Sequence, residues 1–276
     1  MSLNSVNTNI GAMVALQSLN RTNDQLNVTQ KRISTGLRVN DAKDDGAAFA
    51  VAQAVRADVA GLNAANEQLG GVKGILDTSL SGLTKVSETM VKVRETLVRL
   101  ADDTLNTDQR AQYSAQYTAL RTQIENFIAD ATYNGRSLLS TTAPVGGNIT
   151  TTRNESGTTF TINAVAGATT LVVAAAPATA AAAQTALASG GDFSTVQTAI
   201  GNALNAFGSD ARYVDSQISY NKNKADALEA GLGALIDADL AKESARLQSL
   251  QIRQQLGTQA LSIANQAPQT LLSLFR

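Results

Sequence analysis

Apolar residues recur every seven positions along the longest uninterrupted stretch of the chain. One row runs from Ala48 to Leu97, and a second row, three residues behind it, runs from Val51 to Leu100. Spacings of three and four that last this long indicate an α-helix whose apolar seam faces other helices, with left-handed supercoiling. At ~1.5 Å per residue such a helix would be roughly 80 Å long, which a globular body does not need.

Two further segments repeat the same pattern. The shorter one carries an apolar face from Tyr113 to Ala131 and is expected to end at a left-handed cap near Asn134 and Gly135. The longer one runs from Phe193 to Leu235, with a single polar residue, Asn221, in its main row. Three seams of this kind can share one core, so we expect an antiparallel helical bundle.

The middle of the chain, residues 140–191, breaks the pattern and is rich in Thr, Ala and Gly. Within it, residues 148–164 alternate between apolar and polar positions around a turn at residues 154–157, which predicts a β-hairpin. The Ala-rich remainder is compatible with a loop, a weak helix or a small outer lobe.

Both ends of the chain keep heptads that are out of phase with the neighbouring seams. The breaks fall within residues 32–48 and around residues 236–240. Residues 2–20 and 254–275 contain no charged side chain. Helices without a charged face are suited to burial among copies of the same chain, although packing on the chain's own body is the alternative. Asn and Gln residues in these seams are expected to bond one another across helices.

Composition excludes several kinds of chemistry. The chain has no His, Cys or Trp, which removes an imidazole base, a thiolate nucleophile and zinc sites built on these ligands. A net charge of -1, from 22 basic and 23 acidic residues, does not favour nucleic acid or an anionic membrane as a partner. The most apolar segment, residues 169–183, is too weakly hydrophobic for membrane insertion, and the start of the chain does not read as a cleavable signal peptide.

The charged stretch at residues 32–48 has some features of a calcium loop. The loop pattern would take ligands from Asp41, Lys43 and Asp45, continue with Gly46 and close at Ala52. A lysine cannot coordinate a cation, and Ala52 has no side-chain oxygen, so a solvated turn between two helices is the better interpretation. Acid pairs such as Asp102 with Asp103, or Asp237 with Asp239, lack an accompanying cluster and do not predict catalysis or a cofactor.

Five segments of the chain are similar to a known family. They read MSLNSVNTNIGAMVALQSLNRTNDQL, QKRISTGLRVNDAKDDGAAFAVA, MVKVRETLVRLADDT, ATYNGRSLL and IDADLAKESARLQSLQIRQQLGTQALSIANQAPQTLLSLFR. Together they resemble bacterial flagellin over residues 1–140 and 193–276, in the order that the family requires. The short middle is similar to that of the small flagellins of alphaproteobacteria.

The resemblance implies a structural subunit of the bacterial flagellar filament rather than an enzyme. In this family many copies self-assemble into a hollow helical filament for swimming motility, after type III export of the unfolded chain to the cell exterior without signal cleavage. The implied partners are further copies, an export chaperone, the filament cap, hook-associated proteins and other flagellins. A hook-filament junction protein is the alternative.

The expected fold is mainly α, with long antiparallel helices in coiled-coil bundles and a small β-hairpin region in the middle. Residues 1–43 and 237–276 are expected to form an inner coiled-coil layer, and residues 44–147 and 192–236 a helical middle layer. Residues 148–191 would supply the hairpin and a short variable outer region, whose Ser and Thr side chains are candidate sites for O-linked sugars.

The heptad pattern and the resemblance together predict three sets of functional residues. The connector between layers, with contacts to neighbouring subunits, is expected at Arg32, Gly36, Arg38, Asp41, Lys43, Asp44 and Asp45. Inner-layer assembly is expected to use Leu16, Leu19, Leu26, Ile33, Leu247, Leu250, Leu261, Leu271 and Phe275. A family segment recognised by an innate immune receptor matches Val93, Arg94 and Glu95, but residues 96–103 depart from the recognised pattern, so weak recognition is expected.

Overall fold

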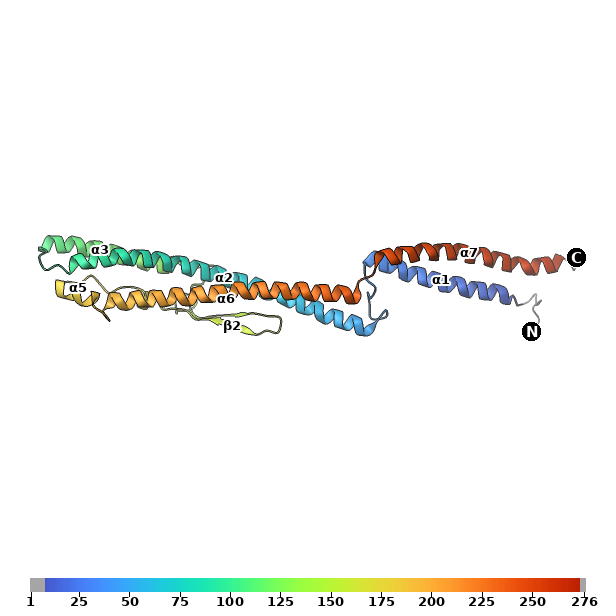
Figure 1. Ribbon diagram of the computed structural model, residues 1–276, viewed down its shortest axis with the longest axis horizontal. Coiled ribbons are helices and arrows are strands. Elements are labelled where there is room, and N and C mark those ends of the chain that lie inside the picture. The colour runs from blue at the N-terminus through green and yellow to red at the C-terminus, as the bar shows by residue number, and fades with distance from the viewer. Residues whose placement is uncertain (1–7, 274–276) are drawn as a thin grey trace. The chain divides into compact units, whose positions relative to one another are not determined.

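The computed structural model describes the backbone of residues 8–273 and the side chains of residues 8–266 (Figure 1). The helices are α1 (Ile10–Thr35), α2 (Gly46–Leu100), α3 (Thr107–Asp130), α4 (Gly167–Thr170), α5 (Ala180–Leu187), α6 (Asp192–Ile236) and α7 (Leu240–Ser273), and the strands are β1 (Ile149–Thr152) and β2 (Thr159–Ile162). One compact unit contains the chain up to Ala57 and from Ala227 onward, and the other is Asp58–Asp226. The mainly helical fold class is confirmed.

The core of the unit Asp58–Asp226 is built from the predicted seams of α2, α3 and α6. Leu69, Leu76 and Leu83 of α2 are fully buried together with Ile124 of α3 and Phe207 of α6. The two apolar rows of α2 are thus confirmed from Leu62 to Leu100. At the start of the helix the second row fails, because Val51 and Asp58 are exposed.

The turn between α2 and α3 is closed by side chains that satisfy the helix ends. Asn106 and Gln109 form a capping box at the start of α3. The Arg110 guanidinium donates to the carbonyls of Leu100, at 2.8 Å, and Asp102, at 2.9 Å, where α2 ends. Helix α3 therefore folds back beside α2 (Figure 1).

The end of α3 differs from the prediction. The helix stops at Asp130 with Ala131 as its cap, four residues before Asn134 and Gly135. These two residues do have positive φ angles, but they form a two-residue turn closed by hydrogen bonds between Tyr133 and Arg136. Asn-Gly favours this turn because both central residues need a positive φ angle.

The predicted hairpin is confirmed, with β1 antiparallel to β2 and Ile149 opposite Ile162. Ile162 is fully buried, whereas Thr150 and Thr161 share a hydrogen bond on the outer face. The Ala-rich remainder contributes the short helices α4 and α5. A connecting segment with Leu171, Val172 and Val173 is buried in the same core. Of the alternatives of a loop, a weak helix or a small outer lobe, the structure thus shows two short helices joined by a packed segment.

The other unit is built around α1 and α7, which lie side by side and antiparallel (Figure 1). Helix α1 begins at Asn9, whose side chain accepts from the N–H of Ala12 at 3.0 Å. It ends at Gly36, which has a left-handed φ of 73° and donates its N–H to the Arg32 carbonyl. Over the described residues, no helix is both long and apolar enough to cross a lipid bilayer.

Candidate functional site

Helices α1 and α7 pack through a narrow seam of small and apolar side chains. Leu26 and Leu250 are buried. A Cβ atom at Gly257 would lie 3.2 Å from Leu19 Cδ1, so the glycine allows the two helices to approach closely. Thr29 is also buried in this unit. The pair therefore has a core, but a thin one.

Polar contacts occur along the same pair of helices. Gln254 Nε2 donates to Asn23 Oδ1 at 2.8 Å, which confirms that amides in the two seams bond each other. Asn9 Nδ2 donates to the Ala264 carbonyl at 2.7 Å. Asn9 at the start of α1 meets the second half of α7, and Asn23 and Gln254 meet near the middle of the two helices, so the contacts fix an antiparallel register.

An ion pair joins the two helices near the connector. Arg32 Nη1 lies 3.1 Å from Glu243 Oε1, and both side chains are largely buried. Arg32 Nε and Glu243 Oε2 are buried without a hydrogen-bond partner among the described residues. A buried ion pair with unpaired atoms stabilises little, but removing one partner leaves an uncompensated charge.

Each of the two helices also exposes apolar side chains that the described residues leave uncovered. On α1 these include Ile10, Met13, which is 63% exposed, and Val14. On α7 they include Ile252, Leu256 and Ile263, the last being 65% exposed. Several exposed apolar side chains at helical spacing are characteristic of surfaces that other proteins cover.

The connector between α1 and α2 pairs with the break between α6 and α7. Leu37 and Asp237 form an antiparallel bridge. The N–H of Arg38 donates to the Ile236 carbonyl at 2.7 Å, and the N–H of Ala238 donates to the Gly36 carbonyl at 2.9 Å. The two register breaks of the sequence therefore meet and form one joint.

The joint has a small apolar core of its own. Val39 is 2% exposed and packs with Ala48, Ala52 and Ile236. Partly buried side chains of Leu37, Phe49, Leu232 and Leu235 surround these four residues. Ala52, where the calcium-loop pattern needs an acid, is thus a core residue of the joint.

The aspartates of the connector bond to backbone N–H groups. Asp45 Oδ1 accepts from Ala47 and Ala48 and so caps the start of α2. Asp44 Oδ2 accepts from the N–H of Asn40, and Asp41 Oδ1 accepts from that of Lys43. These bonds give each carboxylate a local structural role.

A lysine of α1 adds an ionic contact to the connector. Lys31 Nζ lies 2.6 Å from Asp41 Oδ2 and 3.8 Å from Asp44 Oδ2. The hydrogen bond from Lys31, followed by that from the Lys43 N–H, holds the pKa of the Asp41 carboxyl below its ordinary value. Both side chains are well exposed to solvent, so the contact orients the connector more than it stabilises it.

The residues expected at the connector lie together in the structure. Arg38 donates from its guanidinium to the Leu235 carbonyl at 2.5 Å, and the side chain of Lys43 is exposed. Among the inner-layer residues, Leu19, Ile33, Leu247 and Leu261 are half-buried, and Leu16 is exposed. The side chains of Leu271 and Phe275 lie outside the described residues.

The segment matched to the immune-receptor surface is divided between core and solvent. Val93 is fully buried in the helical core, whereas Arg94 and Glu95 are exposed on α2. Glu95 also accepts a hydrogen bond from Arg99 at 2.6 Å. Of these three residues, therefore, only Arg94 and Glu95 are accessible to a partner.

The structural roles of two residues at the joint, Asp239 and Glu243, were not predicted from the sequence. Asp239 caps α7 through the N–H groups of Ala241 and Lys242, as Asp45 caps α2. An aspartate directly before an apolar helical pattern is a signal that could have identified both caps. Glu243, the partner of Arg32, had no comparable local signal.

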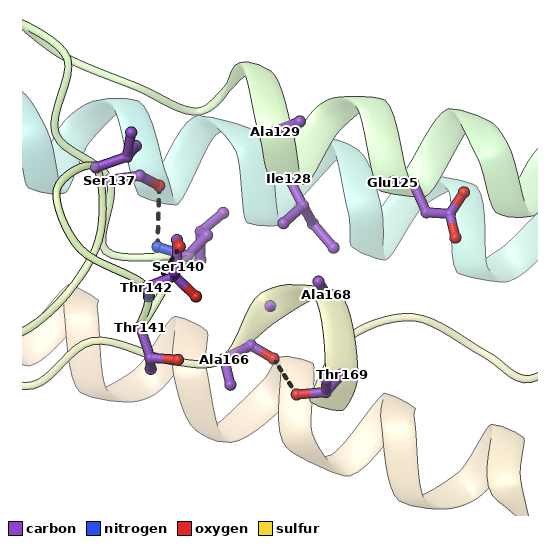
Figure 2. A pocket seen from close by; sticks show the side chains of 13 residues that line it. Glu125, Ile128, Ala129, Ser137, Ser140, Thr141, Thr142, Ala166, Ala168 and Thr169 are labelled. Atoms are coloured by element: carbon purple, nitrogen blue, oxygen red, sulfur yellow. Dashed lines mark hydrogen bonds between the residues drawn. The ribbon is translucent and has the colours of Figure 1, made fainter.

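A hollow of about 500 Å³ lies between α3, the loop after it and α4 (Figure 2). Ile128 and Ala168 point into the same space from opposite sides. The hydroxyls around it bond within their own segments, as Ser137 does to the Leu139 N–H and Thr169 to the Ala166 carbonyl. Glu125 pairs with Arg121 at 2.9 Å. The arrangement offers apolar and hydroxyl surface but no acid-base pair.

Two family models of bacterial flagellin match this chain. The bacterial flagellin N-terminal helical region matches residues 6–143, and the bacterial flagellin C-terminal helical region matches residues 194–275. Flagellin FljK of Caulobacter vibrioides is 40% identical over 278 residues, and the alignment covers 100% of both chains. A flagellin of Brucella melitensis is 34% identical over 289 residues, with 99% of each chain covered.

Among solved structures, the crystal structure of Bacillus cereus flagellin is similar with a TM-score of 0.36 and 19% identity, over 66% of this chain and 94% of that chain. The assignment does not depend on this low similarity. It rests on the two matched regions, which span most of the sequence, and on relatives that cover all of it. The chain therefore belongs to the bacterial flagellins, the structural subunits of the flagellar filament.

Proposed function

We propose that α1 and α7 are the main assembly surface of this flagellin and that neighbouring copies cover their exposed apolar side chains. The observation that carries the proposal is the combination of two uncharged segments, 2–20 and 254–275, with apolar residues left exposed on both helices. As a flagellin, the protein acts outside the cell in a filament of many copies.

The physical chemistry favours assembly over isolated packing. Fully burying one large apolar side chain contributes about 1.5–3 kcal/mol, and each helix exposes several of them. Part of this gain is lost because the helices must be ordered when they associate. Contacts that repeat between copies without closing a ring produce a filament of unlimited length.

The connector is proposed to make further contacts with neighbouring copies. Arg38, Lys43, Asp44 and Asp45 are exposed around a joint held by its own core. Two of these side chains are positive and two are negative, which suits polar contacts to an identical subunit. Gly36 and Asp41 would keep the connector in the required conformation, and Arg32 would hold α1 to α7.

Layering and partners follow the family resemblance. We propose that residues 1–43 and 237–276 form the inner layer, 44–147 and 192–236 the middle layer, and 148–191 the outer region. An export chaperone bound to the C-terminal helix, the filament cap, hook-associated proteins and other flagellins are the proposed partners. We propose no catalytic role and weak recognition by the innate receptor. The hook-filament junction alternative is not favoured by the matched relatives.

The assembly surface can be tested by changing polarity at fixed size. The double substitution Leu256→Gln with Ile263→Gln places amides on the exposed face of α7 and is expected to prevent polymerisation, because these amides would be buried unpaired between copies. Leu256→Met with Ile263→Met is the matched control and should still form filaments. Sedimentation and negative-stain electron microscopy provide the measurement. Normal filaments from the glutamine variant would refute the proposal.

A further inference from the structure

Asn221 is a polar residue at the centre of an otherwise apolar seam. It follows Phe207 and Val214 in the heptad row of α6 and is fully buried, with 0% exposure. Its amide nitrogen donates to Asn66 Oδ1 of α2 at 3.0 Å and to the Arg153 carbonyl at 2.9 Å. Its oxygen accepts from Gln217 at 2.9 Å. All hydrogen-bonding groups of this amide except one acceptor position are therefore used.

The Arg153 carbonyl comes from the turn of the β-hairpin. It accepts a second hydrogen bond from Gln217 Nε2, at 3.2 Å. The backbone of one turn thus completes a polar cluster that is otherwise formed by α2 and α6.

Other contacts hold the same turn against the two helices. Glu155 forms an ion pair with Lys224 of α6, which holds the pKa of the Glu155 carboxyl below its ordinary value. Arg153 Nη1 donates to the Tyr213 hydroxyl at 3.0 Å. At Gly61 of α2 an added Cβ would lie 3.1 Å from Glu155 Cβ, so the glycine lets the turn approach the helix closely.

We propose that Asn221 and Asn66 are positioning residues that fix the axial register of α6 against α2, and that the hairpin turn completes this lock. A seam of apolar residues repeated every seven positions permits slippage by a heptad, because each shifted register again places apolar side chains opposite one another. A buried amide removes that freedom, because in any shifted register it would be unpaired. The inference concerns the soluble subunit and does not depend on assembly.

The test replaces the amides by apolar residues in the full-length chain. In Asn66→Leu with Asn221→Leu, the main heptad row of α6 becomes wholly apolar, so the melting temperature should be unchanged or higher, as happens when buried polar groups are replaced. The hairpin turn should nevertheless loosen. Hydrogen exchange over residues 149–162 is expected to accelerate about tenfold, because the Arg153 carbonyl loses its bond to Asn221 and Gln217 is no longer held.

Register is measured with two spin labels. The chain has no cysteine, so Ser81→Cys on α2 and Ser219→Cys on α6 label unique, exposed positions. Pulsed electron paramagnetic resonance should give one narrow distance with the native amides. In the leucine variant we expect an additional population, because a slip of one heptad moves the helices by about 10 Å.

Two further variants serve as a control and as a separate test of the hairpin turn. Ser79→Ala removes a buried hydroxyl of α2 whose one hydrogen bond among the described residues goes to the Ile75 carbonyl, so exchange in the hairpin and the spin-label distance should both stay native. Gly61→Val leaves the amides intact but displaces the turn, and it should increase both hairpin exchange and the spread of distances. A single native distance with native hairpin protection in the leucine variant would overturn the proposal. If that variant does not fold, a native distance in Gly61→Val would overturn the role of the turn.

Discussion

Asp45 and Asp239 have the same role at two breaks that are far apart in the sequence. Each precedes a long helix and accepts hydrogen bonds from the second and third N–H groups of that helix. In the sequence, the charged stretch at residues 32–48 had some features of a calcium loop. In the structure, its carboxylates mostly accept hydrogen bonds from backbone N–H groups. An aspartate before a helix indicates a cap from the sequence alone, but the N–H groups that it accepts from are known only from the fold.

Tyr117 is a single residue whose environment predicts a pH effect. Burial, reinforced by the charge of Asp192, raises its pKa to about 12, and its hydroxyl donates to the Ala174 carbonyl at 3.2 Å. Because the folded pKa lies above the ordinary value of 10.0, folding keeps the proton on this phenol. Stability should be unaffected below pH 10 and should fall between about pH 10 and 12.

Ultraviolet titration of tyrosinate in the folded protein checks this prediction. One of the five tyrosines should ionise at clearly higher pH, and Tyr117→Phe should remove that component. The phenylalanine variant should also lose less stability than the native protein over the same alkaline interval. A titration curve that is unchanged by the substitution would contradict the assignment.

Helix α2 shows how far periodicity alone predicts an element. Its apolar rows predicted the buried face correctly from Leu62 to Leu100, because burial repeats with the geometry of the helix. The pattern did not say why several glycines lie within so long a helix. In the structure Gly82 faces Ala131, and Gly74 faces the ring of Tyr133, so the segment after α3 packs directly on the backbone of α2.

Alanine substitutions in α2 separate packing from helix propensity. At Gly82 an added Cβ would lie 2.8 Å from Ala131 Cβ, and we expect Gly82→Ala to lower the free energy of unfolding by about 1–3 kcal/mol. At Gly70 a Cβ meets nothing within 4 Å, so Gly70→Ala should raise it by about 0.5–1 kcal/mol. Urea unfolding followed by circular dichroism measures both. Equal effects of the two substitutions would show that Gly82 is not a packing site.

At the scale of the whole molecule, the two units differ in what they can do alone. The unit Asp58–Asp226 contains most of the large buried side chains. The terminal pair has a thin seam and exposes much of its apolar surface. A subunit built in this way has a stable body and a pair of helices that gain stability from neighbours.

A truncated chain tests this division. Removal of residues 1–34 and 240–276 eliminates the helices with exposed apolar rows and keeps the large core. The remaining protein should be helical, unfold cooperatively and stay soluble without forming filaments. Circular dichroism, thermal unfolding and electron microscopy at high protein concentration give the three readouts. Filaments of the truncated chain would place the essential assembly contacts elsewhere.

The long helices, the hairpin, the two breaks and the uncharged ends could all be predicted from the sequence, because they depend on periodicity and composition over neighbouring residues. The pairing of distant polar groups, by contrast, emerges only from the fold. Arg32 and Glu243 are 211 residues apart, and the Arg153 carbonyl finds Asn221 across 68 residues. Such pairs leave no local pattern, since the physical requirement, a partner for a buried polar group, can be met from anywhere in the chain.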